Sequence, residues 1–254
     1  MQQQTSVLSH LRQFFRIKTQ AIIAQIESVF IPERKTLCKF LKSRGEIPKC
    51  TRYLRRHGYR SHRLSCKDWD LANIAKDLTD GNLLDMGSWD SYILENALLK
   101  GLHGEKIGID LQEPTRQIEG VKFIKGNCLS TPFQDNFFQN ITCLSVIEHE
   151  IDFAQFAREV SRLLTQEGRL YLTFDYWNPK VKPSIRIFDK EWKILDRIDA
   201  ENLINEFKRV DLYLVDDIDW SLGTPVINDI YHSPDLSISY TFGLFVFQKK
   251  NKCN

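Results

Sequence analysis

Long apolar runs and paired cysteines are both missing from this sequence of 254 residues. No stretch approaches the ~20 apolar residues that a membrane-spanning helix needs. The chain starts with Met-Gln-Gln-Gln rather than with the basic residues of a secretory signal. We therefore expect neither a membrane span nor a signal peptide. The six cysteines include no Cys-x-x-Cys pair, and reduced thiols in a cytoplasmic protein explain their scatter best.

Net charge is also small, +2 at pH 7, and the apolar (42%) and charged (27%) fractions are those of an ordinary soluble globular protein. The charge is uneven, however, because the stretch before Cys66 is rich in basic residues and contains the acids Glu33 and Glu46. Its basic residues are Arg34, Lys35, Lys39, Lys42, Arg44, Lys49, Arg52, Arg55, Arg56, Arg60 and Arg63. A solvated helical face and a surface for an anionic partner both fit this asymmetry.

The first part of the chain has the pattern of a helical extension. Apolar residues between Val7 and Ile31 recur at three- and four-residue steps, which predicts a helix with one apolar face that Pro32 ends. Such a helix packs on its own domain or lies on a membrane surface or partner. Up to Cys66 the chain is interrupted by glycine and proline, so we expect short helices and turns. We interpret residues 1–66 as an N-terminal helical, basic extension and residues 67–254 as the main domain.

After Cys66, short apolar segments alternate with helical ones. Helices are expected at residues 69–78, 92–100, 153–164 and 199–207. Strands are expected at residues 82–86, 106–110, 121–125, 140–145, 169–174, 210–215 and 239–248. This alternation predicts a mostly parallel sheet with helices on both faces, and the last strand, reached through a long loop, can pair antiparallel. The predicted fold class is therefore α/β and Rossmann-like, with a seven-stranded sheet and an antiparallel last strand.

Polar residues follow the apolar part of four successive strands. The strand ends contain, in chain order, Asp85-Met86-Gly87-Ser88, Asp110-Leu111, Asn127-Cys128, and Ser145 followed by Glu148-His149. In a doubly wound sheet the ligand binds at the carboxyl ends of the strands. This succession resembles the class I S-adenosylmethionine-dependent methyltransferases, in particular a small-molecule branch with a Glu-His pair after the fourth strand. The resemblance extends over roughly residues 69–169.

The resemblance implies S-adenosylmethionine as the cofactor and assigns residues to it. Asp85 corresponds to the acid that helps to place the methionine end, and Asp110 to the acid that accepts both ribose hydroxyls. Asn127 stands where the family commonly has aspartate, and it can accept a hydrogen bond from the adenine amino group. Gly87 lets the backbone approach the cofactor, which a Cβ would obstruct. Neighbouring residues complete the predicted cofactor site, namely Ser88, Leu111, Cys128 and Ser145.

The turn after the first strand departs from the family's Asp-x-Gly-x-Gly-x-Gly, because Trp89 and Ser91 occupy the later glycine positions. Many members of the family tolerate loss of these two glycines. A purely structural turn is the alternative, in which Gly87 turns the chain and Asp85 caps the following helix.

The Glu148-His149 pair bears on metal binding and on catalysis. In ubiquinone-biosynthesis O-methyltransferases, and in the enzymes that methylate the terminal ribose of small RNAs, a glutamate three residues before the pair helps to hold a divalent cation. Ser145 occupies that position here, so we expect no metal. His149 is the candidate general base for a substrate hydroxyl, because imidazole titrates near neutral pH. A histidine that only lines the wall of the site fits the pattern equally well.

Aromatic and acidic residues follow the later strands and are expected at the mouth of the pocket. They are Asp175, Tyr176 and Trp177 after the fifth strand, and Asp216, Asp217, Asp219 and Trp220 after the sixth. Such a lining suits a small polar or sugar-like acceptor, methylated at oxygen. Loop residues that merely cover the domain edge would have the same composition.

Three other functions share parts of this pattern. A nicotinamide-dependent oxidoreductase also needs a ribose acid, but its Gly-x-Gly-x-x-Gly turn is missing. A nucleic-acid methyltransferase is suggested by the basic segment. The Asn/Asp-Pro-Pro-aromatic turn of base-amine methylation does not follow the fourth strand, whereas ribose methylation of RNA stays open. A methyltransferase-like binding module without turnover fits as well, because methyl transfer depends mostly on positioning.

Overall fold

The computed structural model describes residues 36–187, 189–229 and 238–250. The chain divides into two compact units, Met1–Thr36 and Leu37–Asn254, and the second contains the helices and strands given below. The helix predicted between residues 7 and 31 lies outside the described residues.

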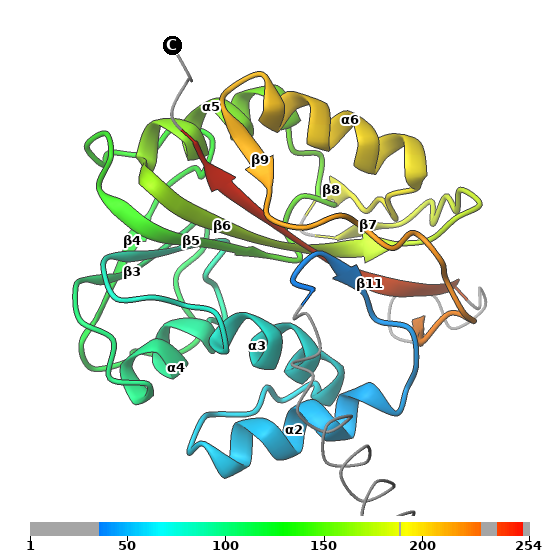
Figure 1. The fold of residues 1–254 in the computed structure, drawn as a ribbon, viewed down its shortest axis with the longest axis horizontal. Helices are drawn as coiled ribbons and strands as arrows, with labels where there is room; N and C mark the ends of the chain where they lie inside the picture. The colour runs from blue at the N-terminus through cyan, green and yellow to red at the C-terminus, as the bar shows by residue number, and fades with distance from the viewer. Residues whose placement is uncertain (1–35, 188, 230–237, 251–254) are drawn as a thin grey trace, which may run out of the picture. The chain divides into compact units, whose positions relative to one another are not determined.

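A large sheet forms the centre of the second unit (Figure 1). In the described residues it has nine strands, with β1, β11, β6, β5, β2, β3 and β4 in this order and with β9 and β10 also paired to β11. The strands are β1 (Lys39–Phe40), β2 (Leu83–Met86), β3 (Lys106–Asp110), β4 (Val121–Lys125), β5 (Phe138–Leu144), β6 (Leu164–Tyr176), β9 (Leu212–Leu214), β10 (Ile227–Asp229) and β11 (Ile238–Lys249). Strands β4, β3, β2, β5 and β6 are parallel, and β11 is antiparallel to β6. The predicted α/β class, a mostly parallel sheet with an antiparallel last strand, is confirmed.

The sheet has two strands more than the seven predicted. All seven predicted segments form strands, and the additional ones are β1 and β10. Both pair with β11, a strand of 12 residues, which meets β10 at Tyr240, β1 at Leu244 and β9 at Phe247. β1 and β10 have two and three residues, and no alternating apolar pattern extends beyond them to mark them in the sequence.

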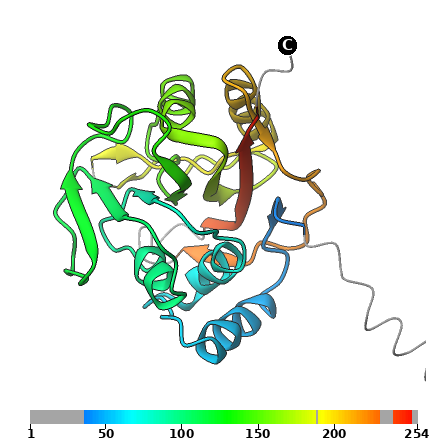
Figure 2. The same cartoon turned by 60° about the vertical axis from the view of Figure 1, so that its left-hand side comes forward.

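Helices cover both faces of the sheet (Figures 1 and 2). On one face lie α2 (Glu46–Arg56), α3 (Asp68–Ala75) and α4 (Ile93–Leu99), and on the other lie α5 (Phe153–Leu163) and α6 (Arg197–Lys208). A 3-10 turn, η1 (Ser65–Lys67), leads into α3. A hairpin of β7 (Arg186–Ile187) and β8 (Lys190–Glu191) separates β6 from α6. Within the described part of the chain, no helix is long and apolar enough to span a membrane.

Local sequence explains where the amphipathic helices begin. The carboxylate of Asp152 accepts a hydrogen bond from the backbone N–H of Gln155 (2.9 Å) and caps α5. Asp196 and Asp199 form a reciprocal capping box at the start of α6. On α5, the buried side chains of Phe156, Val160 and Leu163 follow one another at about one helical turn, and they form the face that packs against the sheet.

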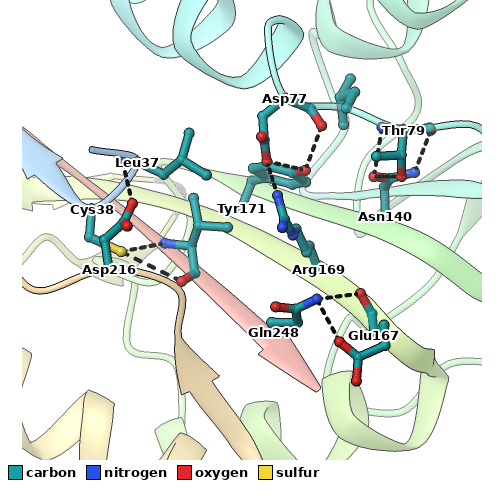
Figure 3. A network of polar contacts seen from close by, with 12 residues as sticks. Leu37, Cys38, Asp77, Thr79, Asn140, Glu167, Arg169, Tyr171, Asp216 and Gln248 are labelled. Carbon is teal, nitrogen blue, oxygen red and sulfur yellow. Dashed lines mark hydrogen bonds and ion pairs between the residues drawn. The ribbon is translucent and has the colours of Figure 1, made fainter. Parts of the chain in front are cut away.

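The predicted domain boundary at residue 66 falls inside the second compact unit. Phe40 and Leu54 are at most 1% exposed, and the Phe40 ring stacks on Tyr176 of β6 with centroids 4.3 Å apart. Cys38 fastens the same segment to the sheet, because its thiol hydrogen-bonds the backbone of Val246 on β11 (Figure 3). Residues from Leu37 onward therefore belong to the main domain, since their apolar side chains complete its core.

Polar contacts at the amino ends of the central strands hold the fold together (Figure 3). Asp77 precedes β2 and accepts hydrogen bonds from Arg169 Nη1 (2.6 Å) and from the Tyr171 hydroxyl (2.9 Å), both on β6. The Asn140 side-chain amide on β5 donates to the carbonyl of Thr79 (2.9 Å). These contacts join the connection between α3 and β2 to the next two strands, so we interpret this edge as structural.

Candidate functional site

The parallel register brings the predicted strand ends to one edge of the sheet. Asp85 on β2 pairs with Gly108 on β3 and with Thr142 on β5, and Asp110 at the end of β3 pairs with Lys125 on β4. The loops that follow β2, β3, β4 and β5 therefore all leave from the same side, opposite the Asp77 contacts. This is the side on which open α/β sheets bind ligands.

The turn after β2 depends on two glycines. Gly87 has φ +82°, and a Cβ built on it would lie 2.2 Å from Val146 Cγ2 in the loop after β5. Ser88 is buried, and its hydroxyl lies 2.5 Å from where a Cβ of Gly108 would stand. Both close approaches require residues without a side chain, so the glycines fit this turn tightly against β3 and β5.

Asp85 is buried beneath this turn, at 3% exposure. Its carboxylate accepts a hydrogen bond from Thr142 Oγ1 (2.6 Å). Burial raises the pKa of Asp85 to about 6, and the hydroxyls of Ser91 and Thr142 limit the shift because they stabilise the ionised form. The charge of Asp110 also raises the pKa of Asp85, which indicates that the two predicted acids lie near each other.

Asp110 makes two hydrogen bonds with the loops at the ends of β2 and β3. One carboxylate oxygen accepts the backbone N–H of Trp89 (3.0 Å) and the other that of Gln112 (2.9 Å). The side chain thus closes the turn after β2, yet it stays partly exposed at the sheet edge. Leu111, the next residue, is 62% exposed. A carboxylate oxygen has more than one acceptor position, so both loop closure and ligand binding are available to Asp110.

Two arginines stabilise the turn in place of the later glycines. Arg63 pairs with Asp90 (3.0 Å), and its guanidinium lies 5.8 Å from the centre of the Trp89 ring. Arg116 donates to the carbonyl of Ser91 (2.8 Å). Part of the basic segment that the sequence suggested as an extension is therefore used inside the domain.

The predicted adenine side of the site follows β4. Asn127 is exposed, and its Oδ1 accepts the backbone N–H of Leu129 (2.9 Å). Cys128 is half-buried, and burial raises the pKa of its thiol to about 11, so the thiol is neutral.

A group of buried charges, which we call the Lys67 cluster, lies at the ends of β5 and β6. It consists of Lys67, Asp70, Ser145, Glu148 and Asp175. Lys67 Nζ is 3.3 Å from Asp70 Oδ2, donates to the hydroxyl of Ser145, and lies 3.8 Å from the centre of the Phe242 ring. Burial opposes the charge of Lys67, but Asp70, Asp175 and Glu148 outweigh this effect and raise its pKa. Ser145 has φ +56°, an uncommon backbone conformation for serine that occurs at functional sites.

Glu148 and Asp70 both have buried carboxylate oxygens without a hydrogen-bond partner among the described residues, but Asp70 lies beside Lys67 whereas no ion pair of Glu148 is seen there. Glu148 is 1% exposed, and Oε2 is its oxygen without a hydrogen-bond partner among the described residues. Burial, and then the charge of Asp175, raise the pKa of Glu148 well above its ordinary value, while Lys67 opposes the shift. Asp175 accepts a hydrogen bond from Trp192 Nε1 (2.9 Å).

Sequence reasoning missed Lys67 and Asp70 as site residues. The only signal was their spacing, because residues three apart at a helix start share a face. Where this face lies relative to β5 and β6 follows only from the packing of α3.

His149 is held by the segment that follows β6. Its backbone pairs with Trp192 in an isolated antiparallel bridge, and the N–H of Lys193 donates to the carbonyl of Glu148 (2.9 Å). This segment therefore covers the loop after β5. Across the part of the chain that the structure describes, no group of three or more His, Cys, Asp or Glu side chains is arranged to hold a metal ion.

Two of the acids predicted at the pocket mouth are used elsewhere. Asp216 accepts the backbone N–H of Leu37 (2.7 Å), and Asp219 pairs with Lys42 (2.5 Å), so both fasten the segment around β1. Trp220 packs against Phe40 with centroids 5.6 Å apart. These contacts favour the alternative that the sequence left open, in which the three residues cover the edge of the domain.

Comparison with known proteins agrees with this geometry. Residues 84–172 match the family model described as a methyltransferase domain. Over 63 residues the chain is 40% identical to the uncharacterized methyltransferase YcgJ of Bacillus subtilis (strain 168). That stretch is 25% of this chain and 24% of the relative, so the chain spans about a quarter of the curated relative that it matches.

Solved structures share the fold. The crystal structure of YcgJ from Bacillus subtilis has a TM-score of 0.54 at 20% identity, covering 72% of this chain and 98% of that chain. A chain of the complex that contains the Haloferax volcanii Trm112 methyltransferase activator has a TM-score of 0.52 at 16% identity, covering 80% and 95%. The described residues thus share the fold of these solved structures, and residues 84–172 are similar to a methyltransferase domain, in agreement with the predicted enzyme class.

Proposed function

We propose that this protein is an S-adenosylmethionine-dependent methyltransferase that methylates a small polar or sugar-like acceptor at oxygen. The observation that carries the proposal is the single sheet edge at which three neighbouring strands end, β2 with Asp85 and Gly87, β3 with Asp110, and β5 with Ser145. The match of residues 84–172 to a methyltransferase domain supports the reaction class.

The residues at this edge fit the cofactor. We assign the partly exposed carboxylate of Asp110 to the ribose hydroxyls and buried Asp85, with Ser88 and Ser145, to the methionine end. The loop residues Asn127 and Cys128 belong beside the adenine, with the exposed apolar side chain of Leu111 available to pack on it. When bound, S-adenosylmethionine supplies a methyl group carried on a sulfonium cation.

Methylation of a hydroxyl oxygen requires that the acceptor lose its proton. We assign His149 as the base that takes it, as in the branch of the family with a Glu-His pair after the fourth strand. The antiparallel bridge between His149 and Trp192 supports this role, because it holds the histidine against the segment that follows β6. Half-buried Trp177 lies in the same segment and suits a polar ring as acceptor.

Binding and label transfer test the proposal separately. Calorimetric titration of the full chain with S-adenosylmethionine and with S-adenosylhomocysteine should give saturable binding of both. With a radiolabelled methyl group, sugars and nucleosides should become labelled while a matched panel of amines stays unlabelled. His149→Asn should slow transfer by roughly 10²–10⁴-fold and remove its pH dependence, with cofactor affinity unchanged. Label on amines alone would contradict oxygen as the target, and absence of binding by either ligand would contradict the function as a whole.

A second candidate, ribose methylation of RNA, is favoured by the outer face of α2. Its exposed basic side chains form no ion pair with other described residues, and they are Lys49, Arg52, Arg55 and Arg56. The three arginines line a surface groove of about 590 Å³ together with Ser65, two residues before Lys67. Binding of single-stranded RNA that falls steeply with salt, and that Arg52→Glu abolishes, would support this candidate. RNA that stays unbound at low salt would remove it.

A further inference from the structure

The Lys67 cluster contains more negative groups than its single cation balances. Lys67 is 20% exposed and faces Asp70, Glu148 and Asp175, each of which is at most 6% exposed. Ionised carboxylates without partners are costly to bury, so burial raises the pKa of Glu148 and favours its protonated form in the free protein. The unpartnered Oε2 of Glu148 marks a place where an additional positive charge would be stabilised.

The position of the Glu148 carboxyl group in the fold indicates which positive charge binds beside it. Glu148 follows Ser145 by three residues in the loop after β5, and Asp175 lies near the end of β6, so both belong to the edge assigned to the cofactor. The cofactor carries a positive sulfonium before methyl transfer, whereas its product, S-adenosylhomocysteine, has a neutral thioether at the same atom. The two ligands are otherwise alike.

We propose that Glu148, supported by Asp175, is the counter-charge of the cofactor's sulfonium and distinguishes the cofactor from its demethylated product. This inference rests on the proposed function, because it needs the cofactor at this edge. Glu148 loses its carboxyl proton to solvent when the sulfonium is bound. After transfer the positive charge is gone, and Glu148 takes up a proton again. Over a full cycle Glu148 regains the proton that it lost on cofactor binding, and the one proton released to solvent is that of the acceptor hydroxyl.

Among the titratable groups in this part of the fold, Glu148 is the one that we expect to change its charge when the cofactor binds. Lys67 on η1 remains a cation, because Asp70 on α3 pairs with it. Asp175 on β6 is the nearest negative neighbour and accepts from Trp192. The thiol of Cys143 on β5 stays neutral, because burial raises its pKa well above the ordinary value.

The pH dependence follows with a definite sign. A bound cation stabilises the ionised carboxylate, so the pKa of Glu148 falls in the complex. Between its pKa values in the complex and in the free protein, binding releases about one proton, and affinity rises with pH by up to about tenfold per unit. A neutral thioether produces neither effect. The affinity ratio of the cofactor to its product therefore increases with pH over this range.

Calorimetry of the full chain at pH 7, in two buffers of different ionisation enthalpy, measures the released protons directly. We expect about one proton released with S-adenosylmethionine and none with S-adenosylhomocysteine. Glu148→Gln should abolish the release and weaken cofactor binding by roughly tenfold or more, with product binding unchanged. Glu150→Gln is the matched control, because Glu150 lies in the same loop but is exposed, 4.0 Å from Lys190. This variant should behave like the wild type.

The pH profile of the affinity ratio in the wild type gives the same answer without a variant, should Glu148→Gln fail to fold. Equal proton release with both ligands, a flat ratio, or a Glu148→Gln protein that retains the wild-type ratio would each overturn the inference while leaving the proposed function intact. Absence of heat with both ligands would overturn the proposed function, and this inference with it.

Discussion

Replacing Asp110 with alanine separates the loop closure that the structure shows from the ribose binding that we propose for this carboxylate. In the free protein it accepts two backbone N–H groups, at 3.0 Å from Trp89 and 2.9 Å from Gln112. Hydrogen bonds to a charged acceptor stabilise by ~1.5 kcal/mol or more when buried, and partial exposure reduces this, so we expect a loss of about 1–2 kcal/mol in the free energy of unfolding. For a chain of this length each kcal/mol lowers Tm by roughly 2–4 °C.

The effect on binding should be larger. Two ribose hydroxyls donated to the same carboxylate would contribute about 3 kcal/mol together, which is on the order of a hundredfold in Kd. S-adenosylmethionine and S-adenosylhomocysteine share the ribose, so Asp110→Ala should weaken both equally. That result differs from the one expected for Glu148→Gln, which should weaken the charged ligand alone.

Calorimetry and urea unfolding on the same samples measure both effects. Asp80→Ala is the control, because Asp80 also accepts a backbone N–H, from His103 (3.1 Å), but lies exposed at the amino end of β2. It should leave both affinities unchanged. An Asp110→Ala protein that is destabilised but binds both ligands normally would refute the assignment of Asp110 to the ribose and leave only loop closure.

Three further outcomes are expected. Phe40→Ala should lower the free energy of unfolding in urea by about 3–5 kcal/mol, because the ring is 1% exposed. A loss under 1 kcal/mol would show that residues 37–66 are an appendage and do not belong to the core. Gly87→Ala should abolish cofactor binding in calorimetry, because its Cβ would meet Val146 Cγ2 at 2.2 Å and its φ is positive. Added Val146→Ala should restore binding only in part, whereas normal affinity in Gly87→Ala would show that the turn is not needed. The pKa of Asp85 is about 6 in the folded protein and 3.8 ordinarily, so the folded state keeps this proton up to a higher pH than the unfolded state does. The stability of the wild type relative to Asp85→Asn should therefore fall as pH rises from about 4 to 6, by at most roughly 3 kcal/mol, and a constant difference would contradict the buried acid.

The strands of the central sheet were predictable because each contains a short, mostly apolar segment between turns. β2 and β3 illustrate this, since both were expected within one residue of their observed bounds. The glycine turn and the polar strand ends followed from the same pattern, because parallel strands present their carboxyl ends at one edge. The places of Asp85, Gly87 and Asp110 at strand ends follow from this local logic, whereas their assignment to the cofactor comes from the resemblance to the family.

The partners of these residues were not predictable in the same way. Arg63 appeared in the sequence as part of a basic run, yet it pairs with Asp90 across a separation of 27 residues. Asp219 appeared as a pocket acid, yet it binds Lys42 at the opposite end of the domain sequence. Composition reports the charge of a segment, whereas the identity of each charged partner depends on contacts between distant parts of the chain.

The sequence by itself determined the α/β class, the order of the central strands along the chain and the edge at which we propose that the cofactor binds, because hydrophobic periodicity and turn residues act over a few neighbours. Only the tertiary structure decided that residues 37–66 complete the core, since burial of Phe40 depends on β6 and β11. It likewise decided that the charges of Glu148 and Asp175 act on Lys67 and raise its pKa. Desolvation and charge pairing arise from packing between segments far apart in the chain, and no local pattern encodes them.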